Sequence, residues 1–215
     1  GASFVLSARK ADSSEPWNTN FDLYLVSADG SGSARNLTEA NKAWDTGPVF
    51  SADGKTLYYR AMTRPGFEAD RFALMAMDLA TGKARDLAPK WDASADCITL
   101  SADGKSIYTT AQELGRHPLF AVSVDNGEVT SIFKDGSVSS FELAGDTLVV
   151  SANSMNSGDV IYATSADGRT ASLTFDMPGE CAAGACDLVL DADVPVDLAV
   201  TVDGAPAAVR RDGAK

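Results

Sequence analysis

Short apolar runs separated by glycine turns recur along the first 175 residues. Valine, isoleucine, leucine, threonine and aromatic residues dominate these runs, which is the composition of β-strands. Apolar residues at the 3.6-residue spacing of an amphipathic helix are almost absent. The pattern therefore predicts an all-β fold.

One phrase of this pattern repeats. Residues 51–58, SADGKTLY, return fifty positions later as residues 101–108, SADGKSIY, and a weaker copy occupies 143–149. A second phrase, strand, glycine turn, strand, has turn glycines 52, 45 and 41 residues apart: Gly30, Gly82, Gly127 and Gly168. Repeats of about 40–50 residues built from short strands are typical of β-propeller blades.

Four strands can be placed in each of three repeats. We expect them at 48–51, 56–62, 72–79 and 84–87, then at 97–101, 106–110, 119–124 and 129–133, and then at 140–143, 147–152, 160–165 and 170–175. A further repeat begins the chain at 4–8 and lacks its innermost strand. We therefore predict a β-propeller of about four blades of four antiparallel strands over residues 1–175.

The remaining residues, 176–215, are an unassigned β-rich tail. Residues 196–202 alternate like a strand and can turn at 202–205 into a second strand at 207–210. One tail strand would complete the first blade and remove two open sheet edges. The propeller is thus expected to be either partial or closed by a strand of the tail.

Strand direction divides the loops between two faces of the predicted propeller. Loops that join second to third strands share a face with the links between blades, because antiparallel strands alternate. Asp53-Gly54 and Asp103-Gly104 are expected to form two-residue hairpins on the other face. The shared face is expected to carry all three tryptophans and several charged residues: Trp17, Trp44, Trp91, Glu15, Glu68, Asp70, Arg71, Glu113 and His117.

Trp44-Asp45 and Trp91-Asp92 have the form of a repeated motif at the blade junctions. We expect each tryptophan to wedge between neighbouring blades while the aspartate caps loop amides. The alternative, stacking of the tryptophans on a ligand, is less favoured.

Composition limits the partners. The formal net charge is −12, with 45% hydrophobic and 22% charged residues. The sequence has no cluster of lysine and arginine of the kind that nucleic-acid binding requires. No stretch is long and apolar enough to be a membrane-spanning helix. We expect no nucleic acid, no membrane and no cofactor among the partners.

The three cysteines leave the compartment open. Cys181 and Cys186 are close enough in sequence to close a small disulfide loop, which would suit a periplasmic or secreted protein. Two free thiols, compatible with a cytoplasmic protein, fit equally well. Cys97 lies in an apolar run and is predicted to belong to the core.

No catalytic residue is predicted in this chain. His117, the only histidine, precedes Pro118 at the start of a strand and is expected to be structural. Residues 136–140, GSVSS, lack the second glycine of a Gly-x-Ser-x-Gly nucleophile elbow. The cysteines lack the spacing of zinc ligands, and four aspartates lack that of an EF-hand loop, so no metal site is predicted either: Asp176, Asp187, Asp191 and Asp193.

The loops carry a resemblance to a known family. Residues 15–24 (EPWNTNFDLY), 43–50 (AWDTGPVF), 64–71 (RPGFEADR) and 115–120 (GRHPLF) resemble the bacterial dipeptidyl aminopeptidase and acylaminoacyl-peptidase branch of the prolyl oligopeptidase family. The resemblance covers about 4–174. It implies a seven- or eight-bladed propeller before an α/β-hydrolase domain with a Ser-Asp-His triad, in which the propeller filters peptides by size and holds their N-terminal end. The sequence departs from that pattern in having too few blades and no nucleophile elbow.

Two functions remain open on this basis. One is the propeller of a prolyl oligopeptidase-type serine peptidase, which gates and orients peptide substrates for a hydrolase domain absent from this chain. The other is a free-standing periplasmic propeller that acts as a binding or protein-interaction module. For the first, the predicted substrate-binding residues are Glu15, Trp17, Glu68, Asp70 and Arg71.

Glu68, with Asp70 in support, is the candidate for the ammonium group of the peptide, because a carboxylate is the natural partner of a fixed cation. Arg64 and Arg71 flank the two acids. They are expected either to orient the acids or to neutralise them in a structural network.

Overall fold

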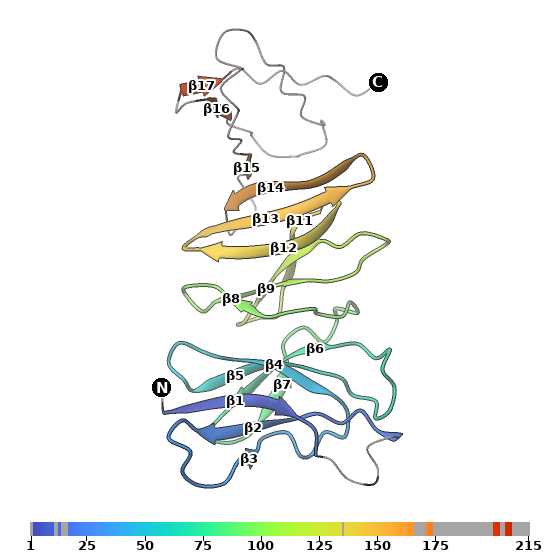
Figure 1. The fold of residues 1–215 in the computed structure, drawn as a ribbon, viewed down its shortest axis with the longest axis vertical. Coiled ribbons are helices and arrows are strands. Elements are labelled where there is room, and N and C mark those ends of the chain that lie inside the picture. Colours follow the sequence, from blue (N-terminus) through green and yellow to red (C-terminus); the bar gives the residue numbers. More distant parts are fainter. Residues whose placement is uncertain are drawn as a thin grey trace. The chain divides into compact units, whose positions relative to one another are not determined.

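The described chain is built from antiparallel sheets (Figure 1). The computed structural model describes residues 2–10, 13, 17–134, 136–165, 171–173, 200–202 and 205–207. Two compact units result, Gly1–Glu113 with Leu119–Thr130 and Leu114–Pro118 with Ser131–Lys215. In the described part of the chain, no helix has the length and apolar character needed to cross a membrane. The all-β prediction is confirmed.

Four sheets are β-propeller blades, and within each blade every strand pairs with its neighbour in sequence. The first blade contains β1 (Ser3–Ala8), β2 (Asp22–Ser27) and β3 (Arg35–Asn36). The second contains β4 (Asp45–Phe50), β5 (Thr56–Ala61), β6 (Ala73–Asp78) and β7 (Ala84–Asp86). The third contains β8 (Thr99–Leu100), β9 (Ser106–Thr110), β10 (Leu119–Ser123) and β11 (Val129–Phe133). The fourth contains β12 (Ser137–Ala144), β13 (Thr147–Ser154), β14 (Ser157–Ser165) and β15 (Ala171–Leu173).

The predicted strands agree with these bounds to within three residues at every end. The first blade has three strands among the described residues, as predicted. In the tail, β16 (Val200–Val202) pairs with β17 (Ala205–Ala207), so the predicted turn is present and its second strand begins two residues early. Completion of the first blade by a tail strand stays a prediction, and so does the division of the chain at residue 175.

The Asp-Gly turns are longer than predicted. The Ser51 amide donates to the Thr56 carbonyl (2.8 Å) and closes a loop of four residues, 52–55, instead of two. Gly54 donates back to the Ser51 carbonyl (2.9 Å) with φ of +69°, while Asp53 keeps a negative φ. Asp53 enforces this shape, because its Oδ1 accepts from Ser51 Oγ (2.7 Å) and from the Lys55 amide (3.1 Å). The same bonds recur at Asp103, so a four-residue turn replaces the expected type I′ hairpin at both sites.

The core of the first unit lies between neighbouring blades. Adjacent residues of β5 serve two cores, because side chains alternate across a strand. Tyr59 packs with Leu23 of the first blade, whereas Tyr58 packs with Ile107 and Val122 of the third. Burial of each such aliphatic side chain contributes about 1.5–3 kcal/mol, so the second blade is held from both sides.

Trp44 and Trp91 wedge between blades, as predicted. The Trp44 ring lies 5.0 Å from the Phe21 ring and 5.7 Å from the Phe72 ring, which precede β2 and β6. The Trp91 ring lies 5.3 Å from that of Phe120 in β10. Both tryptophans therefore join one blade to the next.

The two Trp-Asp pairs are nevertheless not equivalent. The Asp45 amide donates to the Phe21 carbonyl (2.8 Å). In the next link, the matching bond is donated by the Ala95 amide to the Phe72 carbonyl (3.0 Å). Trp91 instead matches Asn41, since each donates its amide to the carbonyl three residues before it. Asp45 is fully buried and accepts from the Asn41 side chain (2.9 Å) rather than from a loop amide, whereas Asp92 is exposed. The prediction that Trp44-Asp45 and Trp91-Asp92 are equivalent positions of a repeat was therefore wrong.

All three tryptophans lie at the end of the blades that carries the β5–β6 loop, residues 62–72. The Met62 amide donates to the Trp44 carbonyl (2.9 Å), and Arg71 Nη1 donates to the Trp91 carbonyl (2.8 Å). A Cβ atom on Gly66 would lie 4.0 Å from the Trp17 carbonyl. The prediction of one shared face for the tryptophans is confirmed.

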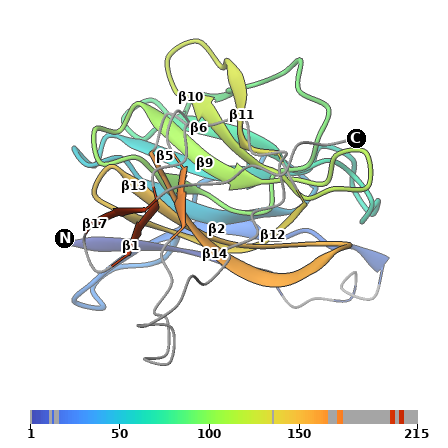
Figure 2. The same ribbon diagram turned by 90° about the horizontal axis from the view of Figure 1, so that it is seen from above.

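The sheet of the fourth blade (β12 to β14, yellow to orange in Figure 2) belongs to the second unit. Register shifts interrupt it between Val138 and Ser140 and between Ala152 and Ser154. His117 Nδ1 donates to the Val138 carbonyl (2.8 Å), and the Val138 amide donates to the His117 carbonyl (2.9 Å). These bonds confirm the structural role expected of His117.

Candidate functional site

The candidate site consists of two neighbouring loops of the first unit. The 62–72 loop joins β5 to β6, and residues 9–21 join β1 to β2. Gly66 and Trp17 bring the loops together, as the 4.0 Å approach described above shows. Both loops join second to third strands, which is why they emerge on the same face.

Asp70 holds the 62–72 loop in shape. Its Oδ2 accepts from the amides of Thr63 (2.9 Å) and Arg64 (2.8 Å), and its Oδ1 accepts from Arg64 Nε (2.9 Å). Burial raises the pKa of the Asp70 carboxyl, but the amide bonds and the Arg64 guanidinium outweigh it and hold the pKa well below its usual range. Asp70 is therefore ionised and its oxygens are used inside the loop.

Arg71 fixes the end of the same loop to the next blade junction. Its Nη1 donates to the Trp91 carbonyl, and its Nη2 pairs with Asp86 Oδ2 at 2.8 Å. Both side chains of this pair are largely buried, at 27% and 23% exposure. The loop thus begins and ends on bonds that fix its geometry.

Glu68 differs from Asp70 in having no such role. Its side chain is exposed and makes no hydrogen bond or ion pair with any residue that the structure describes. The two arginines that flank it have other partners: Arg71 pairs with Asp86, and Arg64 pairs with Asp70 and lies over the Phe67 ring, 4.0 Å from the ring centre. Glu68 is consequently the acid of this loop that remains available to a ligand.

Two exposed aromatic side chains lie in these loops. Trp17 is 85% exposed and Phe67 43% exposed. Sequence reasoning selected Trp17 but missed Phe67, although its position between a Pro-Gly turn and Glu68 was a usable signal. Glu15 lies outside the described residues.

The cysteine predictions are only partly addressed. Cys97 is half-buried, with its sulfur 4.0 Å from Thr109 Oγ1, so it lies at the edge of the core. Cys181 and Cys186 lie outside the described residues. The disulfide and the periplasmic or secreted location therefore stay predictions.

Comparison with known proteins finds peptidases that resemble this chain over part of their length. No protein-family model matches it. It is 30% identical over 157 residues to dipeptidyl-peptidase 5 of Porphyromonas gingivalis, a match that covers 73% of this chain and 23% of that protein. The chain is a distant homologue of dipeptidyl-peptidase 5. The resemblance to this branch of peptidases, expected from the loops, is confirmed.

Solved structures support the fold of this dipeptidyl-peptidase 5 homologue. Pyrococcus horikoshii acylaminoacyl peptidase matches with a TM-score of 0.62 at 19% identity, over 82% of this chain and 26% of that one. The β-propeller domain of the trilobed protease from Pyrococcus furiosus matches with a TM-score of 0.59 at 14% identity, over 75% of this chain and 49% of that one. These likenesses establish the propeller fold.

This chain spans less than a quarter of the length of the dipeptidyl-peptidases 5 that it matches. The matches are therefore to one portion of longer proteins. What the whole protein does is a matter for proposal.

Proposed function

We propose that the chain is the substrate-orienting propeller of a prolyl oligopeptidase-type serine peptidase, and that Glu68 binds the terminal ammonium of the peptide. Homology to dipeptidyl-peptidase 5 supports the class of enzyme. A hydrolase domain of the same protein would supply the chemistry. The propeller would then gate and orient the peptide in front of it.

The observation that carries the assignment to Glu68 is the division of labour between two acids of one loop. The carboxylate oxygens of Asp70 accept hydrogen bonds from Thr63 and Arg64, so Asp70 could bind a ligand only if the bonds that hold the loop were broken. Glu68 is two residues away, exposed, and without a partner among the described residues. A fixed backbone that presents a single available carboxylate suits recognition of a single cation.

The aromatic side chains add a reason for selectivity. Trp17 and Phe67 expose apolar surface in the same two loops as Glu68, and contact with a peptide would displace water from that surface. Exclusion of water strengthens a charge-assisted hydrogen bond. The two loops would therefore provide both a charge for the ammonium and apolar surface for the rest of the peptide.

Substitution of Glu68 by glutamine tests this proposal. In the full-length protein, kcat/KM would be compared for a dipeptidyl substrate with a free amine and for its N-acetylated counterpart. Loss of one charge-assisted contact should lower kcat/KM about 10- to 100-fold on the free amine alone. Glu142→Gln, at an exposed acid of β12, serves as the control and should change neither substrate.

Equal losses on both substrates would mean that Glu68 supports the structure instead of binding the amine. No loss on either substrate would overturn the proposal.

A further inference from the structure

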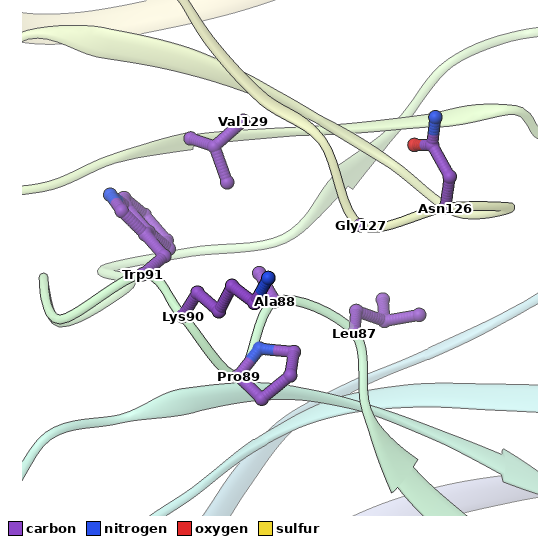
Figure 3. A pocket seen from close by; sticks show the side chains of 8 residues that line it. All are labelled: Leu87, Ala88, Pro89, Lys90, Trp91, Asn126, Gly127 and Val129. Carbon is purple, nitrogen blue, oxygen red and sulfur yellow. The ribbon is translucent and has the colours of Figure 1, made fainter.

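A cavity of about 380 Å³ lies at the junction of the second and third blades, within the first unit (Figure 3). One wall is the link that follows β7, and the other is the turn between β10 and β11. This volume is within the range of small-molecule sites in proteins. Its lining includes Leu87, Ala88, Lys90, Trp91, Asn126 and Val129, with Gly127 at the turn.

The link wall is held in place independently of any ligand. The Ala88 amide donates to Asp86 Oδ1 (2.9 Å), and the Trp91 amide donates to the Ala88 carbonyl (3.0 Å). The Trp91 carbonyl accepts from Arg71, and the Trp91 ring packs on Phe120. The aromatic side of the cavity is thus preformed, which lowers the entropic cost of binding.

The backbone of the opposite wall, at Gly127, lies in close contact with the link. A Cβ atom on Gly127 would lie 1.8 Å from the Leu87 carbonyl oxygen. Only glycine fits here, and its φ of +73° also favours glycine. This contact sets the floor at one end of the cavity, while Val129 and Trp91 line the other (Figure 3).

Lys90 is the charged residue of the lining. Lys90 is exposed, and Figure 3 shows its side chain extending along the link wall. No residue in the described part of the chain pairs or hydrogen-bonds with it. Asp92, Asp125 and Glu128 are exposed nearby in sequence, but none of them lines the cavity.

We propose that this cavity binds a small carboxylate with an aromatic or branched aliphatic body. The carboxylate pairs with Lys90 Nζ, and the body packs against Trp91 and Val129. A single ammonium matches the single charge of a carboxylate, whereas a phosphate would face the neighbouring acids with only one cation. The site is separate from the use of Glu68, so it stands or falls on its own.

Titration of the isotope-labelled 215-residue chain with phenylacetate tests the proposal by NMR. Saturable shifts are expected at the Trp91 indole and at the amides of Ala88 and Gly127, with a Kd on the order of 1 mM for so small a ligand. Phenylacetamide keeps the ring but not the charge, and acetate keeps the charge but not the ring. Each should bind at least about tenfold more weakly, because each lacks one of the two contacts.

Lys90→Gln gives the matched variant. It should weaken phenylacetate about tenfold and leave phenylacetamide unchanged, while Lys83→Gln, at the exposed β6–β7 turn, should change neither. The amide spectrum itself reports whether each variant is folded. Equal binding of phenylacetate and phenylacetamide, an unaltered affinity in Lys90→Gln, or no saturable shift at the cavity would each overturn the proposal.

Discussion

The link between the first and second blades and the link between the second and third blades make matching backbone hydrogen bonds. They differ in the side chains that lie beneath those bonds. In the first link, Leu37 donates to Leu23 (2.7 Å), and in the second, Leu87 makes the matching bond to Leu74 (2.8 Å). The first interior is polar, with Asp45 bonded to Asn41 and with Thr38 Oγ1 accepting from the Leu23 amide (3.0 Å). The second has Trp91 and Ala95 at the positions of Asn41 and Asp45, and Trp91 lines a cavity.

The difference shows what a repeated fold leaves free. Backbone bonds between a link and the preceding blade set the spacing, so side chains can change without loss of the propeller. One junction contains a polar network with a buried acid. The other has Trp91 and Ala95 at the matching positions and a cavity with room for a ligand. Function in such a fold is therefore to be sought where two repeats differ.

The largest expected effect is on the free energy of unfolding when a turn glycine is replaced by alanine. Gly127→Ala forces a methyl group into the Leu87 carbonyl, so the junction must open and the free energy of unfolding should fall by at least about 4 kcal/mol. Gly82, at the corresponding turn of the second blade, has φ of +72° but no neighbour within 4 Å. Gly82→Ala should therefore cost only about 1–2 kcal/mol of backbone strain. Denaturant unfolding measures both, and equal costs would refute the close contact.

The second effect concerns the buried acid of the first junction. Burial, partly offset by hydrogen bonds from Asn41 and Thr38, raises the pKa of Asp45 from 3.8 to about 7. The folded chain then keeps a proton that the unfolded chain loses, so the contribution of Asp45 to stability falls as pH rises from about 4 to 7.

Substitution isolates this contribution. Between pH 4 and 7, the free energy of unfolding of Asp45→Asn should gain roughly 2–4 kcal/mol relative to that of the unmodified chain. The asparagine stays neutral at every pH, so the variant lacks the penalty that the ionised acid brings. Parallel pH profiles of the two proteins would contradict the account.

A smaller effect separates the two acids of the 62–72 loop. Asp70→Ala removes the acceptor of the Thr63 and Arg64 amides and should lower the free energy of unfolding by about 1–2 kcal/mol. Glu68→Ala should change it by less than about 0.5 kcal/mol, as is usual for an exposed side chain. Thermal unfolding compares them, and a larger cost at Glu68 would show that the structural roles are reversed.

Sequence reasoning found the blades because their period and strand composition are local features. It placed strand ends within three residues and put the tryptophans on one face for the same reason. The misread Trp-Asp repeat shows the limit, since equivalence between links is defined by bonds to Phe21 and Phe72, which no local pattern reveals. The Asp-Gly turns were mistaken because the side chain of Asp53 competes for the turn geometry.

The candidate site was predictable in position but not in roles. The alternating direction of the strands predicted the face on which the loop lies, and its charged residues indicated a binding role. Which of Glu68 and Asp70 is available depends on hydrogen bonds across six or seven residues, which the sequence does not display. The cavity escaped prediction entirely, because it arises from Leu87 and Gly127, forty positions apart, approaching each other.

The most direct test of the central claim observes the Glu68 carboxyl itself. A carbon NMR titration of the chain with a short peptide should shift the side-chain carboxyl signal of Glu68 and leave that of Asp70 in place. The N-acetylated peptide should shift neither, because it lacks the ammonium. A shift of Asp70 instead of Glu68, or an equal response to both peptides, would contradict the account.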